Sequence, residues 1–274
     1  MPRSGVLTCS RTLTRCEMMT KIVQACAISL LLVATSAVCQ TTWSNLQPGL
    51  ELLNRSFPDH GETVPFVLLR CNPKKYRVRI IDTLHELGKA NSFAAFSLNE
   101  IQNKMRALII VNGGSTSSYS IPAPAGLLQV GGKTVSPPNY LTERAGVLCI
   151  TRGIVSILPL SRSQPRCFDA VQRGPYMSRE FLSVPDAPSR RYRRTIAAID
   201  GDGQLLILVT NEKATLSSVA AFLYASNSKL DVRSALNLDG DTSSGLIVAT
   251  GGDLRTVGNI DRLIASAIAI FKAD

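Results

Sequence analysis

Apolar runs separated by short polar turns that contain glycine dominate this chain. Residues 195–200 and 204–209 are two such runs, joined by Gly201-Asp202-Gly203, and together they predict a β-hairpin. Residues 76–81 alternate large apolar and basic side chains, as a half-exposed strand does. Residues 106–112 predict a buried strand that runs into Gly113-Gly114. Strand-forming patterns therefore account for most of the chain.

Helical patterns are few. Residues 98–105 suit a helix that begins at Ser97 or Asn99, and residues 219–223 suit a second helix capped by Thr215 or Ser217. Residues 263–271 fit either a helix or a last strand. No repeat and no linker requires a second domain. We predict an α+β fold with a mixed, largely antiparallel sheet and a few packed helices in a single domain.

The N-terminus has the pattern of a secretory signal. An apolar run over residues 22–38 follows Lys21 and closes with small side chains at 34–37. The run is short for a membrane span, which needs about 20 apolar residues. We interpret residues 1–39 as a signal peptide, which starts at Met1 or at Met18 or Met19, and residues 40–274 as the mature domain. A retained signal anchor is the alternative.

Charge and cysteine content refine this picture. The net charge is +10; residues 1–39 carry four basic and one acidic side chain (+3), which leaves +7 for the rest. A basic exported protein, periplasmic or secreted, suits anionic partners such as phosphorylated glycans or a cell envelope rather than nucleic acid. Of seven cysteines, Cys71, Cys149 and Cys167 lie in the mature part. The pair Cys149–Cys167 is the candidate disulfide. With two histidines and no CxxC spacing, we expect no metal and no cofactor, and a cysteine nucleophile is disfavoured.

One polar segment stands out as a candidate site. Residues 236–244 read Leu-Asn-Leu-Asp-Gly-Asp-Thr-Ser-Ser and lie between the predicted helix 219–223 and a predicted strand at 245–250. A turn fixed between rigid elements can present a charged group in a cleft. Asp239 is the candidate carboxylate, and an aspartate that caps its own turn is the alternative.

Four segments, in order, resemble a known family. They are Ile110-Val-Asn-Gly-Gly114, Gln172-Arg-Gly-Pro-Tyr176, Arg194-Thr-Ile-Ala-Ala-Ile-Asp200 with Gly203, and Asn237-Leu-Asp-Gly-Asp-Thr-Ser-Ser244. Together they resemble the phosphodiester glycosidase family, and the resemblance runs from about Trp43 to the C-terminus. The family usually has glycines where Asp241 and Thr242 stand here. This departure is compatible with an altered substrate or with lost activity.

The resemblance implies a substrate in which a sugar is linked through its anomeric carbon to a phosphodiester, of the N-acetylglucosamine type. Asp239 then serves as the catalytic carboxylate, and Arg194 as the catalytic clamp on phosphate, because a guanidinium matches phosphate in bidentate geometry. The backbone amides near residue 113 either approach an anion or simply form a tight turn. The predicted substrate-binding residues are Asn112, Gly113, Gly114, Gly174, Gly240, Asp241, Ser243 and Ser244.

These features lead to one leading hypothesis and two alternatives. The leading hypothesis is an exported glycoside hydrolase that cleaves a sugar from a phosphodiester linkage, with Asp239 and Arg194 facing each other across one pocket. The first alternative is a non-catalytic binding module for phosphorylated envelope glycans, favoured by the substitutions at Asp241 and Thr242. A phosphodiesterase that breaks the P–O bond is disfavoured, because such enzymes usually cluster metal ligands.

Overall fold

The computed structural model describes residues 42–84, 95–117, 123–141, 144–161, 166–181 and 190–273. The predicted signal peptide, residues 1–39, lies outside the described residues. The chain from Thr42 onward forms one compact unit. Neither of the two α-helices described is both long and apolar enough to cross a membrane.

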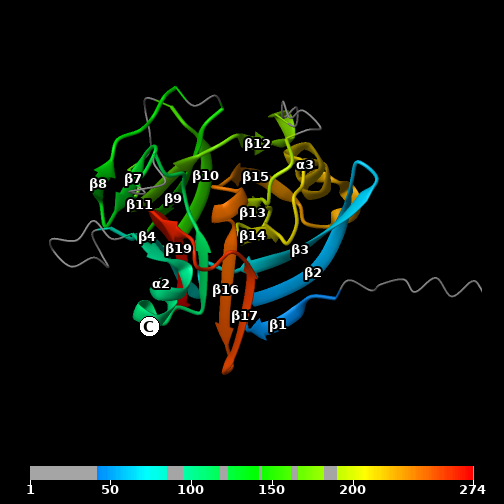
Figure 1. Ribbon diagram of the computed structural model, residues 1–274, viewed down its shortest axis with the longest axis horizontal. Coiled ribbons are helices and arrows are strands. Elements are labelled where there is room, and N and C mark those ends of the chain that lie inside the picture. Colours follow the sequence, from blue (N-terminus) through cyan, green and yellow to red (C-terminus); the bar gives the residue numbers. More distant parts are fainter. Residues whose placement is uncertain are drawn as a thin grey trace, which may run out of the picture. The chain divides into compact units, whose positions relative to one another are not determined.

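Three large β-sheets build this unit (Figure 1). Their strands are β1 (Ser44–Gln47), β2 (Leu50–Asp59), β3 (Glu62–Cys71), β4 (Tyr76–Asp82), β6 (Ile109–Asn112), β7 (Leu128–Val130), β8 (Lys133–Ser136), β9 (Gly146–Thr151), β10 (Ile154–Pro159), β11 (Asp169–Arg173), β12 (Tyr176–Ser178), β13 (Thr195–Asp200), β14 (Leu205–Thr210), β15 (Val232–Asn237), β16 (Gly245–Thr250), β17 (Asp253–Gly258) and β19 (Ser266–Lys272). A small fourth sheet pairs β18 (Leu263–Ile264) with β5 (Phe96–Ser97). The helices are α2 (Leu98–Met105), α3 (Leu216–Tyr224) and the short 3-10 turns η1 (Arg179–Phe181), η2 (Ser226–Ser228) and η3 (Asp241–Ser243).

Strand order places distant parts of the sequence side by side. The seven-stranded sheet runs β1-β2-β3-β14-β13-β15-β12, and the five-stranded sheets run β10-β9-β11-β7-β8 and β17-β16-β6-β19-β4. Every strand pairing among the described residues is antiparallel. Strands β13 and β6 each lie inside a sheet, with a neighbouring strand on both sides. The parts of the candidate site that these two strands carry are therefore held by buried strands.

The inner faces of the three sheets share one apolar core, to which β2, β3, β4, β6, β9, β13, β14, β16 and β19 all contribute. Helix α3 covers the outer face of the seven-stranded sheet, where Phe66, Ile196 and Leu208 meet Val219. Helix α2 covers the outer face of the β6–β19 sheet through Leu98 and Ile101. Central strands such as β13 and β14 are therefore buried on both faces, which explains their unbroken apolar sequences.

The observed fold corrects one part of the sequence prediction. The largely antiparallel sheet is confirmed, but the protein is richer in strands and poorer in helix than an α+β fold with a few packed helices. Residues 263–271, which fitted helix or strand, form β18 and most of β19, and β19 is a strand because it pairs with β4 on one side and β6 on the other. Helix α2 begins as predicted, with a capping box between Ser97 and Glu100.

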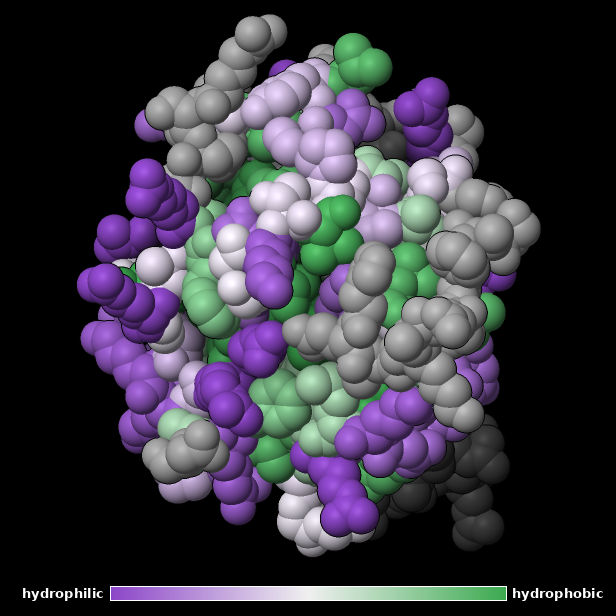
Figure 2. All heavy atoms as spheres, turned by 90° about the vertical axis from the view of Figure 1, so that its left-hand side faces the viewer, coloured by the Kyte–Doolittle hydropathy of each residue, from purple (hydrophilic) through white to green (hydrophobic). Residues whose placement is uncertain are grey.

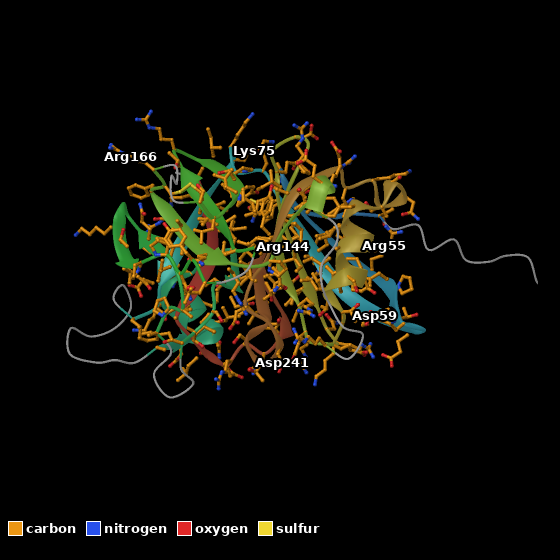
Figure 3. The ribbon with its side chains drawn as sticks, turned by 90° about the horizontal axis from the view of Figure 1, so that it is seen from above. Arg55, Asp59, Lys75, Arg144, Arg166 and Asp241 are labelled. Atoms are coloured by element: carbon orange, nitrogen blue, oxygen red, sulfur yellow. A yellow bond between two sulfur atoms is a disulfide. The ribbon has the colours of Figure 1, made fainter. Side chains whose placement is uncertain are left out.

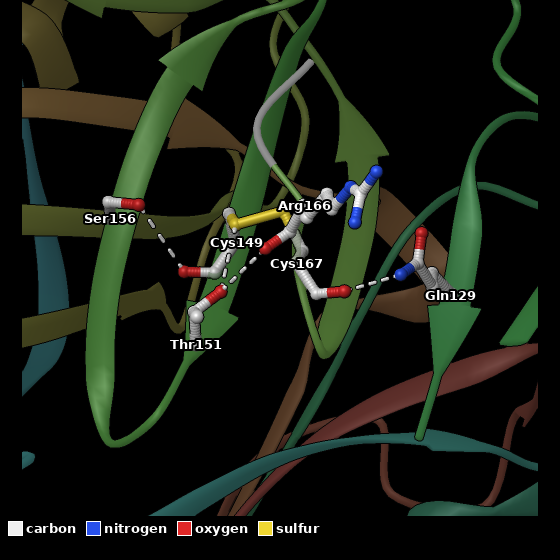
Figure 4. Close-up of a disulfide and its surroundings, with 6 residues drawn as sticks. All are labelled: Gln129, Cys149, Thr151, Ser156, Arg166 and Cys167. Atoms are coloured by element: carbon white, nitrogen blue, oxygen red, sulfur yellow. Dashed lines mark hydrogen bonds between the residues drawn. A yellow bond between two sulfur atoms is a disulfide. The ribbon is translucent and has the colours of Figure 1, made fainter. Parts of the chain in front are cut away.

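The expected pairing of Cys149 with Cys167 is confirmed as a disulfide (Figure 4). It joins β9 to the segment that leads into β11, and the hydroxyl of Thr151 donates to the carbonyl of Arg166 beside it at 3.2 Å. Burial raises the pKa of the remaining thiol, Cys71, to about 12, so this cysteine stays protonated.

A buried carboxylate fixes the segment that precedes β13. Asp59 is fully buried and accepts hydrogen bonds from the hydroxyl of Thr215 (2.6 Å) and from Nε of Arg191 (2.9 Å). Arg191 also pairs with Glu62 at 2.6 Å. Burial raises the pKa of Asp59, but hydrogen bonds from Thr215 and Ser218 and the charge of Arg191 outweigh it and hold the pKa below 3.8.

We predict that Asp59→Asn lowers the free energy of unfolding at pH 7 by roughly 1–3 kcal/mol, because Arg191 loses a buried charged partner. Since the folded-state pKa lies below 3.8, the carboxylate stabilises the protein above that pH and loses this effect as the pH falls. Denaturant unfolding between pH 7 and pH 3 should show the difference from wild type shrinking. Exposed Asp253→Asn is the matched control; a difference that stays constant down to pH 3 would contradict the prediction.

Candidate active site

The predicted polar segment forms the rim of a small cleft. Asp239 follows β15, and η3 leads from it into β16. The cleft has a volume of about 120 Å³ and is lined by residues 115–117 and 239–243. Figure 3 draws Asp241 at the lower edge of the molecule in that view. The structure thus brings the Asp239 loop together with the polar residues that follow β6.

The Asp239 side chain is held from two sides and is 15% exposed. Its Oδ1 accepts a hydrogen bond from Oγ of Ser115 (3.2 Å) and lies 3.4 Å from Nη2 of Arg173. Within the described part of the chain, no hydrogen bond involves Oδ2, so this oxygen remains available to a substrate or a water molecule. Such a carboxylate can act as a nucleophile or as a base for water.

Asn112, at the end of β6, positions this loop from beneath. Its side chain is fully buried, and its Nδ2 donates to the backbone carbonyl of Asp239 at 2.8 Å. Its Oδ1 accepts from Oγ1 of Thr195 (2.8 Å) and from the amide of Gly245 (3.1 Å). Asn112 therefore joins four segments and fixes Asp239 from below. Contact between its buried amide and substrate, as the sequence predicted, finds no support in this geometry.

Gly113 and Gly114 also have a packing role. The amide of Gly113 donates to the carbonyl of Ser266 at 2.9 Å, and that of Gly114 donates to the hydroxyl of Ser266 at 3.0 Å. A Cβ at Gly113 would lie 2.6 Å from that hydroxyl oxygen, and one at Gly114 would lie 2.8 Å from Val171. Both amides are used within the protein, so the expected anion cradle is not formed. Glycine is required here because β19 and β11 pass too close for a side chain.

Arg194 does not meet Asp239, and this expectation was wrong. Its Nε donates to the carbonyl of Ala214 (3.0 Å), its Nη2 donates to the carbonyl of Arg190 (2.9 Å), and its guanidinium stacks on Tyr192. Successive side chains of an extended segment point to opposite faces. Thr195 faces Asn112, so Arg194 faces the α3 side of the sheet, where it is buried.

Arg173, which sequence reasoning missed, is the cation beside Asp239. It ends β11, directly before the cis peptide bond between Gly174 and Pro175. Its Nε is buried and has no hydrogen-bond partner among the described residues, so the guanidinium keeps an unused donor. Arg173 stands in the segment Gln172-Arg-Gly-Pro-Tyr176, which the sequence analysis had singled out. Nothing in the sequence, however, places that segment next to residue 239. Gly174 is buried, and its carbonyl accepts from Nδ2 of Asn237 at 3.0 Å, which indicates a structural role.

The residues after Asp239 divide into two groups. Gly240, Asp241 and Ser243 line the cleft as predicted, although a ligand contact for them stays a prediction. Asp241 has φ +56°, a left-handed conformation that glycine adopts readily and that aspartate adopts more often than most other residues. Ser244 is fully buried and does not line the cleft, so its predicted contact with substrate finds no support.

The cleft offers a carboxylate, hydroxyls and a neighbouring guanidinium. Among the described residues, no group of three or more His, Cys, Asp or Glu side chains is placed to hold a metal ion. Hydroxyl and guanidinium donors suit the oxygens of a sugar or a phosphate. The arrangement is therefore chemically suited to a polar, oxygen-rich ligand.

Comparisons with known proteins identify the family of the chain. The sequence profile of the phosphodiester glycosidase family matches residues 105–271, more than half of the chain, and the chain belongs to this family. The zebrafish N-acetylglucosamine-1-phosphodiester alpha-N-acetylglucosaminidase catalytic domain, solved auto-inhibited by its pro-peptide, has a similar fold. Its TM-score is 0.62 at 17% identity, over 84% of this chain and 86% of that one.

A hypothetical protein from Synechocystis is similar too, with a TM-score of 0.57 at 16% identity, over 85% of this chain and 64% of that chain. At 17% and 16% sequence identity, these two structural matches show the fold alone. No curated protein sequence gave a significant match. The family suggested by the four sequence segments is thus confirmed, while the activity of this chain is a separate question.

We predict that Asn112→Ala destabilises the protein by roughly 2–4 kcal/mol, because it leaves the buried partners of one amide without hydrogen bonds. Denaturant unfolding measures this loss. Asn54, which is exposed on β2, gives the matched control: Asn54→Ala should change stability by less than about 0.5 kcal/mol. Equal stability of the two variants would show that Asn112 does not hold the Asp239 loop.

Proposed function

We propose that this protein is an exported glycoside hydrolase that releases a sugar, of the N-acetylglucosamine type, from a phosphodiester linkage. The observation that carries the proposal is the Asp239 carboxylate, held by Ser115 and Arg173 at a polar cleft in a chain of this family. The zebrafish relative, by its name, acts on an N-acetylglucosamine phosphodiester. We extend that chemistry to this chain as a hypothesis.

In the proposed reaction the bond between the anomeric carbon and the phosphate oxygen breaks. Oδ2 of Asp239 either takes a proton from a water molecule that attacks this carbon, or attacks the carbon itself, through an oxocarbenium-like state. In the second case a water molecule then hydrolyses the sugar ester on Asp239, which frees the sugar and restores the carboxylate. The phosphate oxygen leaves with the bonding electron pair. Because this leaving group is already a stable anion, it needs cationic and hydrogen-bonding support more than it needs a strong general acid.

Arg173 takes the phosphate-binding role that the sequence gave to Arg194. Its Nη2 lies 3.4 Å from Oδ1 of Asp239, and its side chain is 31% exposed. When a phosphate binds, the guanidinium offers paired donors in the fork that phosphate oxygens match. Arg194 uses its donors on backbone carbonyls and supports the fold.

Export to the periplasm or to the outside of the cell is part of the proposal. The pattern of residues 1–39 supports it, as does the disulfide between Cys149 and Cys167, since disulfides persist mainly in oxidising compartments. The proposed ligands are sugar phosphodiesters or phosphorylated glycans, and association with the cell envelope follows from the basic charge of the chain.

A binding module without catalysis is the second candidate function. It is favoured by Asp241, which adds a negative charge to the cleft where the family usually has glycine. Incubation of the purified protein with N-acetylglucosamine 1-phosphodiester separates the two candidates. Release of reducing sugar supports the hydrolase, and binding without release over a long incubation supports the module.

We predict that Asp239→Asn abolishes release of the sugar, by about 10³-fold or more, while the melting temperature stays close to that of wild type. The fold is kept because Asn112 bonds the backbone of residue 239 and not its carboxylate. Exposed Asp253→Asn should leave turnover unchanged. Undiminished activity of the Asp239→Asn protein would remove this residue from the mechanism.

We predict that Arg173→Gln lowers kcat/KM for a sugar phosphodiester by about 10²-fold, and for an uncharged aryl glycoside by much less. Arg194→Gln is the matched control, and it should affect the two substrates equally, through stability. Steady-state kinetics with both substrates measures the difference. If Arg173→Gln reduces both substrates to the same extent, Arg173 does not bind phosphate.

A further inference from the structure

A second, larger cavity carries a concentration of positive charge. It has a volume of about 500 Å³ and lies between β4, the β9–β10 turn and the segment before β11. Arg77, Arg79, Arg152 and Arg166 line it, and we call it the arginine groove. Figure 3 draws Arg166 and Lys75 at the upper edge of the molecule and Asp241 at the lower edge, so this groove is separate from the Asp239 cleft.

Two charges of the arginine groove, those of Arg152 and Arg166, are not neutralised by the described residues. Asp169 is the one acidic residue among its lining residues, and it is fully buried. Asp169 is already engaged by Nε of Arg79 (2.9 Å) and by the amides of Ile80 and Gly131. Arg152 and Arg166 are exposed and form no ion pair with any described residue. The groove therefore presents net positive charge to solvent.

The walls between these arginines are apolar. Val78, Ile150 and Cys167 are buried beneath them, while the ring of Phe168 is 53% exposed. On the face of the molecule drawn in Figure 2, hydrophilic side chains gather along the left-hand edge of the picture, next to hydrophobic atoms. A site with cations at its rim and an exposed ring on its wall suits a ligand that has both anionic groups and an apolar face.

The groove is also held rigidly. The disulfide between Cys149 and Cys167 joins its two sides, and the amide of Phe168 donates to the carbonyl of Ile150 at 2.8 Å. Thr151 bonds the carbonyl of Arg166, as Figure 4 shows. The backbone segments that carry Arg152 and Arg166 are thus joined to each other, so a ligand meets a backbone framework that is already formed.

We propose that the arginine groove binds a second segment of a phosphate-bearing glycan, away from the Asp239 cleft; the choice of ligand rests on the proposed function. Guanidinium groups pair with phosphate oxygens, and the apolar face of a sugar ring packs on Phe168. The volume is that of a site for a small organic ligand and is far larger than one phosphate ion requires. The groove retains a polymeric substrate while another part of it enters the cleft.

The test uses the full chain with Asp239→Asn, so that the probe is not consumed. Isothermal titration with a synthetic tetramer of N-acetylglucosamine 1-phosphate units should show two binding events. Arg152→Asn with Arg166→Gln should weaken one of them at least tenfold and leave the other unchanged. Asparagine suits position 152 because that residue has φ +51°.

Lys229→Asn with Arg255→Gln is the matched control. It removes the same charge at exposed sites outside the groove, and Lys229 also has a left-handed φ of +56°. The proposal is overturned if the groove variant titrates like this control, or if the neutral N-acetylglucosamine tetramer binds equally well. It is also overturned if phosphatidylglycerol vesicles or a DNA duplex bind more tightly than the phosphorylated tetramer.

Failure of the proposed function would appear in a different measurement. The groove variant that retains Asp239 should hydrolyse a small sugar phosphodiester at the wild-type rate, because the groove does not contact the cleft. Absence of hydrolysis by the wild-type protein would refute the hydrolase, whereas the titration would still decide whether the groove binds phosphorylated glycan.

Discussion

The candidate site depends on one buried amide. Asn112 bonds Thr195 of β13, Gly245 of β16 and the backbone of Asp239, so a single side chain links two sheets and the Asp239 loop. A buried amide with unpaired groups is costly, and this arrangement is favoured because all of its partners are present at once. The position of the Asp239 carboxylate is therefore set by the packing of the sheets and not by the loop alone.

Close packing explains the glycines around this amide better than ligand binding does. Gly113 and Gly114 let β6 pass against Ser266 and β11 without a Cβ between them, and their amides bond Ser266. The groups that we propose to face the ligand lie one layer further out, on Ser115, Arg173 and Asp239. The site thus has an inner layer that fixes geometry and an outer layer that supplies charge and hydrogen bonds.

Electrostatics distinguishes the two cavities. The Asp239 cleft is small and contains two aspartates among hydroxyls, with one arginine next to it. The arginine groove is larger, and its one carboxylate is buried and paired. Under the proposed function, this distribution gives part of the net charge of +10 a local role: the groove would attract a phosphorylated polymer, and the carboxylate would act on its scissile bond elsewhere.

The sequence by itself determined the local elements, the family and the carboxylate. Period-two and unbroken apolar patterns identified β13, β14 and β16, the capping residues identified α2, and the Asn237–Ser244 segment identified the cleft. Tertiary structure alone decided which arginine faces Asp239. Alternation along the strand sends Arg194 to the α3 face, whereas β11, distant in sequence, brings Arg173 to the carboxylate. Sequence order does not encode such neighbours, because they arise only when separate sheets pack on one another.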